Sequence, residues 1–150
     1  MPLLVTLATT PEDIAICMAI RHEVFINEQG FHPSIEIDPK DKLPTTRHLL
    51  GKDMDQDKYV ATARCLLTPD LRKAKVGRVA VLKECRGKSF GVAMVKGIEE
   101  VLAHEVDTFM LSSQYDKREF YEKCGYEYLN EEVYLEEGVE HCMMVKKIKA

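Results

Sequence analysis

The segment from residue 77 to residue 91 constrains this chain more than any other. Val79-Ala80-Val81 reads as a strand, the turn after it holds Arg86, Gly87 and Lys88, and an amphipathic helix follows at once. Backbone N–H groups at such a turn can form a cradle for an anion, which the helix dipole reinforces. An ordinary strand-to-helix turn would show the same periodicity, so the pattern alone leaves both interpretations open.

Three other ligand-binding motifs fail at particular positions. Gly87-Lys88-Ser89 resembles the end of a P-loop, but that motif needs a glycine where Leu82 stands. The glycines do not have the G-x-G-x-x-G spacing of a dinucleotide fold. Alternating aspartates at 53–57 imitate the start of a calcium loop, yet Lys58 and Arg64 occupy the places of its glycine and glutamate. We interpret that stretch as a solvated hairpin turn.

The rest of the chain alternates strands and helices. Its 150 residues fit one domain, residues 1–150. Strands are expected at 3–8, 48–50, 59–67, 75–82 and 108–112, with shorter ones at 126–129, 132–135 and 142–145, and helices at 11–27, 89–104 and 117–124. Glycine and three prolines make 30–45 a long irregular loop, a kind of segment that is often functional. The order β-α-β-β-β-α-β-α, followed by the short strands, predicts an α/β domain on a mixed sheet.

Composition and charge exclude several classes of protein. The net charge of −4 disfavours a nucleic-acid binder, and no apolar run approaches the roughly 20 residues of a membrane span. Five cysteines without C-x-x-C spacing disfavour a disulfide framework and a zinc site, so no metal is expected. The start lacks the basic region of a signal peptide, and we expect a cytoplasmic protein. Basic residues gather near the middle and glutamates in the last third, which suggests an anionic ligand and a cationic one opposite.

The turn can be matched to a known family. Arg86-Gly87-Lys88-Ser89-Phe90-Gly91 resembles the pyrophosphate signature of GNAT acyltransferases, Gln/Arg-x-x-Gly-x-Gly/Ala, with Ser89 in place of the first signature glycine. Serine suits a helix N-cap but adopts a positive φ less readily than glycine. Further segments follow the order seen in the ElaA-like branch of that superfamily: 21–29, 36–38, 47–48, 63–64, 77–81, 86–87, 120–126 and 138–144.

This resemblance implies the GNAT acyl-CoA N-acyltransferase fold, a mixed, mostly antiparallel sheet flanked by helices. It also implies acetyl-CoA as the acyl donor. The strand at 79–82 would splay from the strand at 110–113, and the pantetheine arm would add to its open edge. A backbone N–H of Val81 or Leu82 would polarise the thioester carbonyl. The implied cofactor-binding residues are Val79, Ala80, Val81, Arg86, Gly87, Lys88, Ser89, Phe90 and Gly91.

Catalytic roles follow from the same resemblance. Tyr121 matches the usual GNAT general acid, which protonates the departing thiolate, although a tyrosine on an amphipathic helix is often only part of the core. Glu28 and His141 are the candidate general bases, with His48 behind them. The implied pocket residues are His48, Arg64 and Gln114.

The acceptor is expected to be a primary amine of a small molecule or a protein. Glu36, Asp38 and Asp41 in the long loop favour a cationic one. The alternative is a non-catalytic acyl-CoA-binding or partner-binding module on the same fold. An oligomer is compatible with either.

Overall fold

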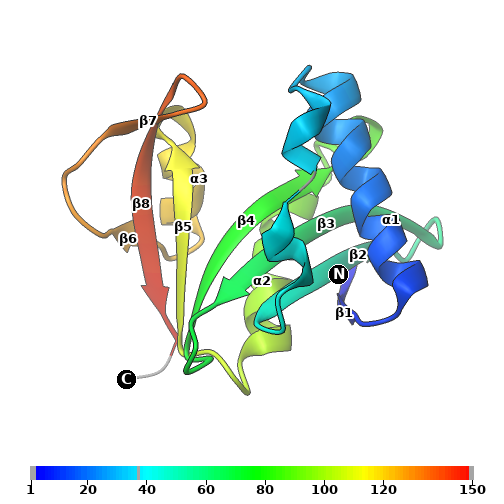
Figure 1. The fold of residues 1–150 in the computed structure, drawn as a ribbon, viewed down its shortest axis with the longest axis horizontal. Coiled ribbons are helices and arrows are strands. Elements are labelled where there is room, and N and C mark those ends of the chain that lie inside the picture. The colour runs from blue at the N-terminus through cyan, green and yellow to red at the C-terminus, as the bar shows by residue number, and fades with distance from the viewer. Residues whose placement is uncertain (1–2, 37, 149–150) are drawn as a thin grey trace.

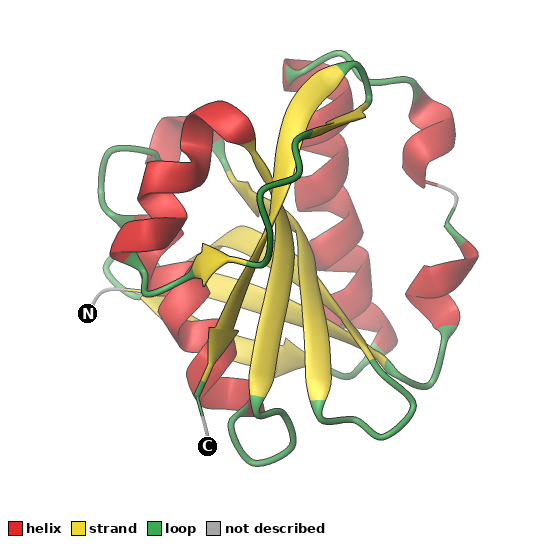
Figure 2. Cartoon of the chain, turned by 90° about the vertical axis from the view of Figure 1, so that its left-hand side faces the viewer, coloured by secondary structure: helices red, strands yellow, loops and turns green. Residues whose placement is uncertain are grey.

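The chain folds into an open mixed sheet with helices on both of its faces (Figure 1, Figure 2). The computed structural model describes residues 3–36 and 38–148. The sheet order is β1-β2-β3-β4-β5-β8-β6, with β7 paired to β8. In chain order the elements are β1 (Leu3–Ala8), α1 (Pro11–Arg21), β2 (Thr46–Asp53), β3 (Lys58–Leu67), β4 (Lys73–Val81), α2 (Phe90–Leu102), β5 (Thr108–Gln114), α3 (Arg118–Lys123), β6 (Glu127–Tyr128), β7 (Tyr134–Glu136) and β8 (Val139–Lys147). The predicted α/β class with a mostly antiparallel sheet is confirmed.

Helix α1 begins where the sequence predicts. Thr10 Oγ1 accepts a hydrogen bond from the Asp13 N–H at 3.1 Å, and Pro11 occupies the first turn. The regular helix ends at Arg21, and a π-helical segment, His22–Glu28, continues it. The predicted end near residue 27 is therefore close to the end of the wider segment, which leads the chain toward the site described below.

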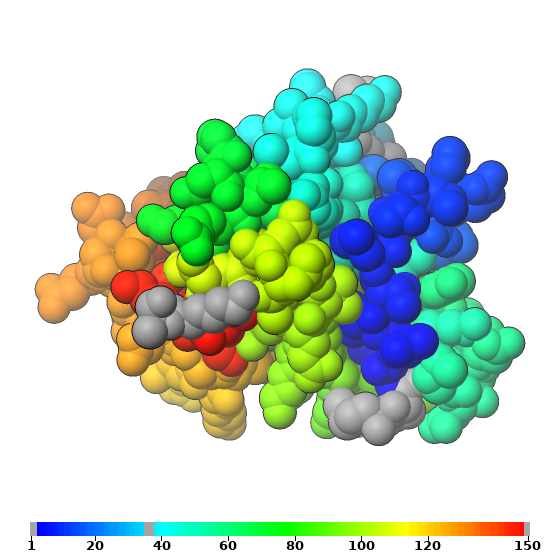
Figure 3. Space-filling view, turned by 90° about the horizontal axis from the view of Figure 1, so that it is seen from below, coloured from blue at the N-terminus to red at the C-terminus, as the bar shows by residue number. Residues whose placement is uncertain are grey.

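Helix α2 packs on the opposite face against β1. Phe90, Met94, Ile98 and Leu102 are buried on one side of the helix, as its period predicts. A Cβ added at Gly97 would lie 2.2 Å from the nearest side-chain atom, so only glycine permits this close approach. Figure 3 shows β1 and the α2 region side by side on the underside of the molecule.

Strands β4 and β5 pair along only part of their length. They run parallel from the pair Lys73 and Thr108 to the pair Val76 and Leu111, and then diverge (Figure 1). At that point β4 contains a bulge, because Arg78 and Val79 both lie opposite a single residue of β3. Arg78 has a positive φ of 51° there. A bulge bends its strand, which fits the divergence at this place.

Several boundaries differ from the prediction. Strand β2 extends to Asp53, because the polar stretch after Leu50 continues the sheet before the turn starts; the Asp53 carboxylate then accepts the N–H groups of Asp55 and Gln56. The loop at 30–45 contains two short 3-10 turns, Pro33–Glu36 and Pro39–Lys42. All five cysteines are free and buried. No helix within residues 3–36 and 38–148 is long and apolar enough to cross a membrane.

Candidate active site

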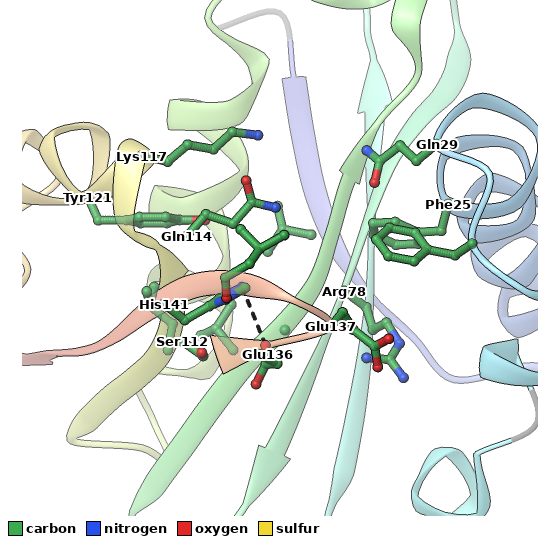
Figure 4. A pocket seen from close by; sticks show the side chains of 16 residues that line it. Phe25, Gln29, Arg78, Ser112, Gln114, Lys117, Tyr121, Glu136, Glu137 and His141 are labelled. Carbon is green, nitrogen blue, oxygen red and sulfur yellow. Dashed lines mark hydrogen bonds and ion pairs between the residues drawn. The ribbon is translucent and has the colours of Figure 1, made fainter. Parts of the chain in front are cut away.

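A cavity of about 300 Å³ opens where β4 and β5 diverge (Figure 4). This volume is at the lower end of the range for small-molecule sites. Apolar side chains of the π-helical segment, β4, β5 and β8 form much of its wall. Its polar and charged lining consists of Gln29, Arg78, Ser112, Gln114, Lys117, Tyr121, Glu136, Glu137 and His141.

The diverging half of β4 presents an open backbone edge to this cleft. Leu82 N–H donates to the Val60 carbonyl at 2.9 Å, so it faces β3. Backbone groups alternate along a strand, and those of Val81 therefore face away from β3. The Val81 carbonyl accepts a hydrogen bond from Arg86 Nε at 3.1 Å. The expectation that Leu82 could supply the polarising N–H is wrong, because that group is already paired; Val81 remains.

The turn after β4 has the backbone of an anion cradle. Gly87 has φ 86° and Ser89 has φ 61°, both left-handed, and α2 begins at Phe90. Ser89 makes no side-chain cap, so the position keeps the glycine-like backbone without glycine. No atom lies within 4 Å of a Cβ built on Gly87, and a ligand could approach the backbone closely there. These features fit a pyrophosphate held by backbone N–H groups at the helix N-terminus.

The other predicted residues of this turn have more ordinary surroundings. The Lys88 ammonium lies 5.9 Å from the centroid of the Phe90 ring, which is buried. Gly91 lies in the first turn of α2 without a positive φ, and a Cβ there would meet Phe120 at 3.4 Å, an ordinary contact. Val79 lines the cavity, whereas Ala80 is buried.

Glu28 is bound to Arg86 and does not line the cavity. The two guanidinium nitrogens of Arg86 reach the two carboxylate oxygens of Glu28 at 2.5 and 2.6 Å, a bidentate pair. The hydrogen bonds from Arg86 hold the pKa of Glu28 below its ordinary value. A carboxylate with a lowered pKa, and with both oxygens hydrogen-bonded to an arginine, is a poor general base. The pair instead fastens the end of the π-helical segment to the anion cradle.

Tyr121 projects from α3 into the cavity (Figure 4). Its ring packs edge-on against Phe120 at 5.0 Å and Tyr126 at 6.0 Å between centroids. Burial raises the pKa of Tyr121 above its ordinary value. The hydroxyl therefore keeps its proton through neutral pH, as a general acid requires.

His141 projects into the same cavity from β8, opposite Gln114 of β5. Its Nδ1 lies 2.7 Å from the Val139 carbonyl, which can only accept, so we assign the ring hydrogen to Nδ1. The lone pair of neutral His141 is then on Nε2, which lies 3.5 Å from Glu136 Oε2 (Figure 4). His141 thus combines burial in the cavity wall with a basic nitrogen next to a carboxylate.

The hairpin formed by β7 and β8 fixes these side chains. Its turn has two residues, Glu137 and Gly138, with φ of 52° and 77°. Tyr134 pairs with His141 across the hairpin, and their rings stack at 6.3 Å. The Tyr134 hydroxyl lies 2.5 Å from Ser112 Oγ, which anchors the hairpin to β5.

His48 and Arg64 do not line the cavity, which corrects the prediction for both; Gln114 does line it. His48 and Arg64 lie on β2 and β3 and are buried beneath the turn at Pro39–Lys42. Arg64 Nη1 donates to Asp38 at 2.7 Å and to Asp41 at 3.0 Å, and His48 Nε2 lies 3.0 Å from the Asp41 carbonyl. The loop covers this part of the sheet, so these side chains contact the loop.

The loop carboxylates are used by arginines. We call this group the arginine–aspartate cluster; its members are Arg21, Arg64, Arg78, Asp38 and Asp41. Hydrogen bonds from Arg64 lower the pKa of Asp38; burial raises that of Asp41, but the bonds from Arg21 and Arg64 outweigh it. Asp38 and Asp41 are thus not free to hold a cationic acceptor, contrary to the prediction. The side chain of Glu36 lies outside the described part of the chain.

Sequence reasoning missed several lining residues. Phe25 comes from the π-helical segment and Gln29 and Phe31 from the residues just after it. Lys117 comes from the turn before α3, and Glu136 and Glu137 come from the β7–β8 hairpin. Only tertiary packing brings these segments together. Arg78 stands in the segment singled out from the sequence, but its place at a bulge was not predicted. The described residues contain no group of three or more histidine, cysteine or acidic side chains arranged for a metal ion.

Comparisons with known proteins agree with this architecture. The profile of the acetyltransferase (GNAT) domain matches residues 47–148. The uncharacterized protein YyaT of Bacillus subtilis is 32% identical over 142 residues, 93% of each chain. The crystal structure of Escherichia coli ElaA superposes with a TM-score of 0.80 at 28% identity, covering 97% of this chain and 98% of that one. An acyl-CoA N-acyltransferase from Pseudomonas aeruginosa gives 0.78 at 25% identity, covering 96% and 99%. The chain belongs to the GNAT acetyltransferase family and has ElaA as a relative.

Proposed function

We propose that the protein transfers an acetyl group from acetyl-CoA to a primary amine. The observation that carries this proposal is one cavity that joins an open β4 edge to the side chains of Tyr121 and His141. The anion cradle at Gly87 and Ser89 lies just beyond that edge and suits a pyrophosphate. The name of the Pseudomonas relative, an acyl-CoA N-acyltransferase, supports the same class of donor.

The cavity residues account for each proton in the transfer. His141 Nε2 accepts a proton from the acceptor's ammonium group, which leaves a neutral amine. The amine nitrogen attacks the thioester carbon, an N–H of the open β4 edge stabilises the oxygen, and the C–N bond forms as the C–S bond breaks. The Tyr121 hydroxyl gives its proton to the departing thiolate sulfur. The second amine proton, lost as the amide forms, restores the Tyr121 hydroxyl by way of solvent, and His141 releases its own proton to solvent.

Binding and turnover test the proposal separately. Calorimetry should show that the protein binds acetyl-CoA more tightly than adenosine, and that removing the 3′-phosphate or the pyrophosphate weakens binding. A screen of primary amines, read as thiol release from acetyl-CoA, should find an acceptor. Binding without turnover of any amine would favour the acyl-CoA-binding module, and absence of any preference for CoA over adenosine would refute both.

A further inference from the structure

The charges in the arginine–aspartate cluster are unevenly matched. Arg21 pairs with Asp41 through two bonds of 2.9 and 3.3 Å, and Arg64 pairs with both aspartates. Within the described part of the chain, Arg78 makes one ion-pair contact, Nη2 to Asp38 Oδ2 at 3.5 Å, and Arg64 binds the same oxygen at 2.7 Å. Among the described side chains, three guanidinium groups therefore share two carboxylates, and Arg78 is the least well paired.

Arg78 is also the member of the cluster that lines the cavity. Its side chain is 31% exposed, against 3% for Arg21 and 7% for Arg64. Burial lowers the pKa of Arg78, and the positive charges of Arg64 and Arg21 lower it further. The negative charges of Asp38 and Asp41 raise it, but by less. The bulge of β4 thus brings a partly compensated positive charge to the cavity wall.

The cavity's own carboxylates do not complete this pairing. Glu136 lies next to His141, and Glu137 is an exposed residue at the hairpin tip, where its charge is screened by water. Neither makes an ion pair with Arg78 among the contacts of the described residues. Lys117, on the opposite wall, adds a second positive charge. A ligand anion would satisfy Arg78, whereas a purely cationic ligand would leave it without a further partner.

We propose that the acceptor amine carries a carboxylate, and that Arg78 binds this carboxylate while the amino group faces His141 and Glu136. The inference rests on the proposed acetyl transfer and names its substrate class, an amino acid or a similar zwitterion. A guanidinium group offers a planar fork that matches a carboxylate, and such charge-assisted hydrogen bonds are strong. The ammonium group is then directed to the wall where the Glu136 carboxylate and the His141 base lie together.

Matched pairs of acceptors test the substrate class. β-alanine, γ-aminobutyrate and β-phenylalanine are each compared with their own carboxamide, which has nearly the same shape without the charge, and with the diamine putrescine. We expect kcat/KM for the carboxylate of at least one pair to exceed that of its amide by about 10- to 100-fold. Equal rates within every pair, or a preference for putrescine, overturns the proposal.

Two arginine variants locate the effect. Arg78→Gln should lower the ratio of kcat/KM for carboxylate over amide by about 10- to 100-fold, to near one, since charge-assisted hydrogen bonds to the carboxylate are what is lost. Arg72→Gln is the matched control, because Arg72 is exposed, pairs with Asp107 outside the cavity and should leave the preference intact. A variant that slows both members of each pair equally contradicts a role for Arg78 in recognising the carboxylate.

Ligand-induced stabilisation keeps the inference separate from the proposed function. In the presence of CoA, the preferred carboxylate should raise the Tm of the wild type more than its amide does, and this difference should vanish in Arg78→Gln. Turnover of amides or diamines alone would uphold acetyl transfer and overturn the carboxylate inference. Absence of turnover together with stabilisation by carboxylates alone would do the reverse. Absence of both overturns both.

Discussion

Under the proposed function, the two walls of the cleft would recognise ligands by different means. The cofactor wall is mainly backbone: an open strand edge on β4 and a turn in which Gly87 and Ser89 have positive φ. The acceptor wall is made of side chains from the turn before α3, the β7–β8 hairpin and the β4 bulge. Backbone recognition depends little on side-chain identity, whereas a few charges decide which amine fits. Substitutions on one wall should therefore leave the function of the other intact.

The largest expected effect comes from Tyr121, which lies between the walls. Tyr121→Phe should lower kcat by about 10²- to 10⁴-fold with little change in the Kd of acetyl-CoA, because the hydroxyl acts mainly in the transition state. Tyr115→Phe removes an exposed hydroxyl outside the cavity and serves as the control. Near-normal kcat for Tyr121→Phe, with an acceptor whose chemical step limits turnover, would leave Tyr121 a packing residue.

The arginine–aspartate cluster should govern stability more than cofactor binding. Asp41→Asn leaves Arg21 and Arg64 without a charged partner on one side, and we expect a loss of about 3 kcal/mol in the free energy of unfolding. The Kd of acetyl-CoA should stay within about threefold of wild type, as expected for a residue remote from the anion cradle. Urea unfolding and calorimetry measure the two quantities. A large loss of affinity without loss of stability would break the separation of the walls.

The unfolding free energy of Asp41→Asn should depend less on acidic pH than that of the wild type. The pKa values of Asp38 and Asp41 are lowered in the folded protein, so their contribution to stability is complete above the unfolded value of about 3.9 and is lost as the pH falls through the folded value. The difference in unfolding free energy between wild type and Asp41→Asn should therefore stay constant from pH 6 to about pH 5 and shrink as the pH falls below about 4. A difference that does not shrink in acid would show that the aspartate acts through packing alone.

A change on the cofactor wall should instead lower the affinity for acetyl-CoA. Gly87→Val places a β-branched residue at φ 86° in the cradle and should weaken acetyl-CoA binding by about 10- to 100-fold. Gly30→Val is the control, because Gly30 has a similar φ of 75° and open surroundings but lies outside the cradle. Equal loss of affinity in both variants would mean that general strain, rather than access to the cradle, is responsible.

The smallest expected effect is a gain. Ser89 holds φ 61° without a side-chain cap, and Ser89→Gly should relieve up to about 1 kcal/mol of backbone cost. Thermal unfolding and acetyl-CoA titration should both shift slightly toward greater stability and affinity. A weaker, less stable variant would indicate that the serine hydroxyl contributes to the turn in a way the backbone does not show.

The sequence predicts the cofactor wall better than the acceptor wall. The cofactor turn is one continuous segment, so its residue types and order indicated a strand, a cradle and a helix. The family resemblance added the splayed strands and the catalytic candidates, of which Tyr121, His141 and Gln114 share the cavity. Their roles stay predictions until kinetic tests are made.

The acceptor side could not be predicted, because its charges are matched by residues far away in the chain. The loop aspartates appeared free for a ligand, yet Arg21 lies 20 positions from Asp41, and Arg64 lies 26 from Asp38. His48 and Arg64 are covered by the same loop. No local pattern distinguishes a carboxylate that faces a cavity from one that neutralises a buried arginine.

The two-residue turn of the β7–β8 hairpin also limits how this protein could diversify. The pairing of β8 with β5 holds His141, whereas the turn length influences the register of β7 and thus whether Glu136 faces the cleft or the opposite surface. A change at Glu137-Gly138 that slips β7 by one residue along β8 would exchange the inward and outward side chains of β7, whereas a slip of two residues could preserve them. The side chains beside His141 should thus change by substitution more readily than by insertions that alter the register of β7.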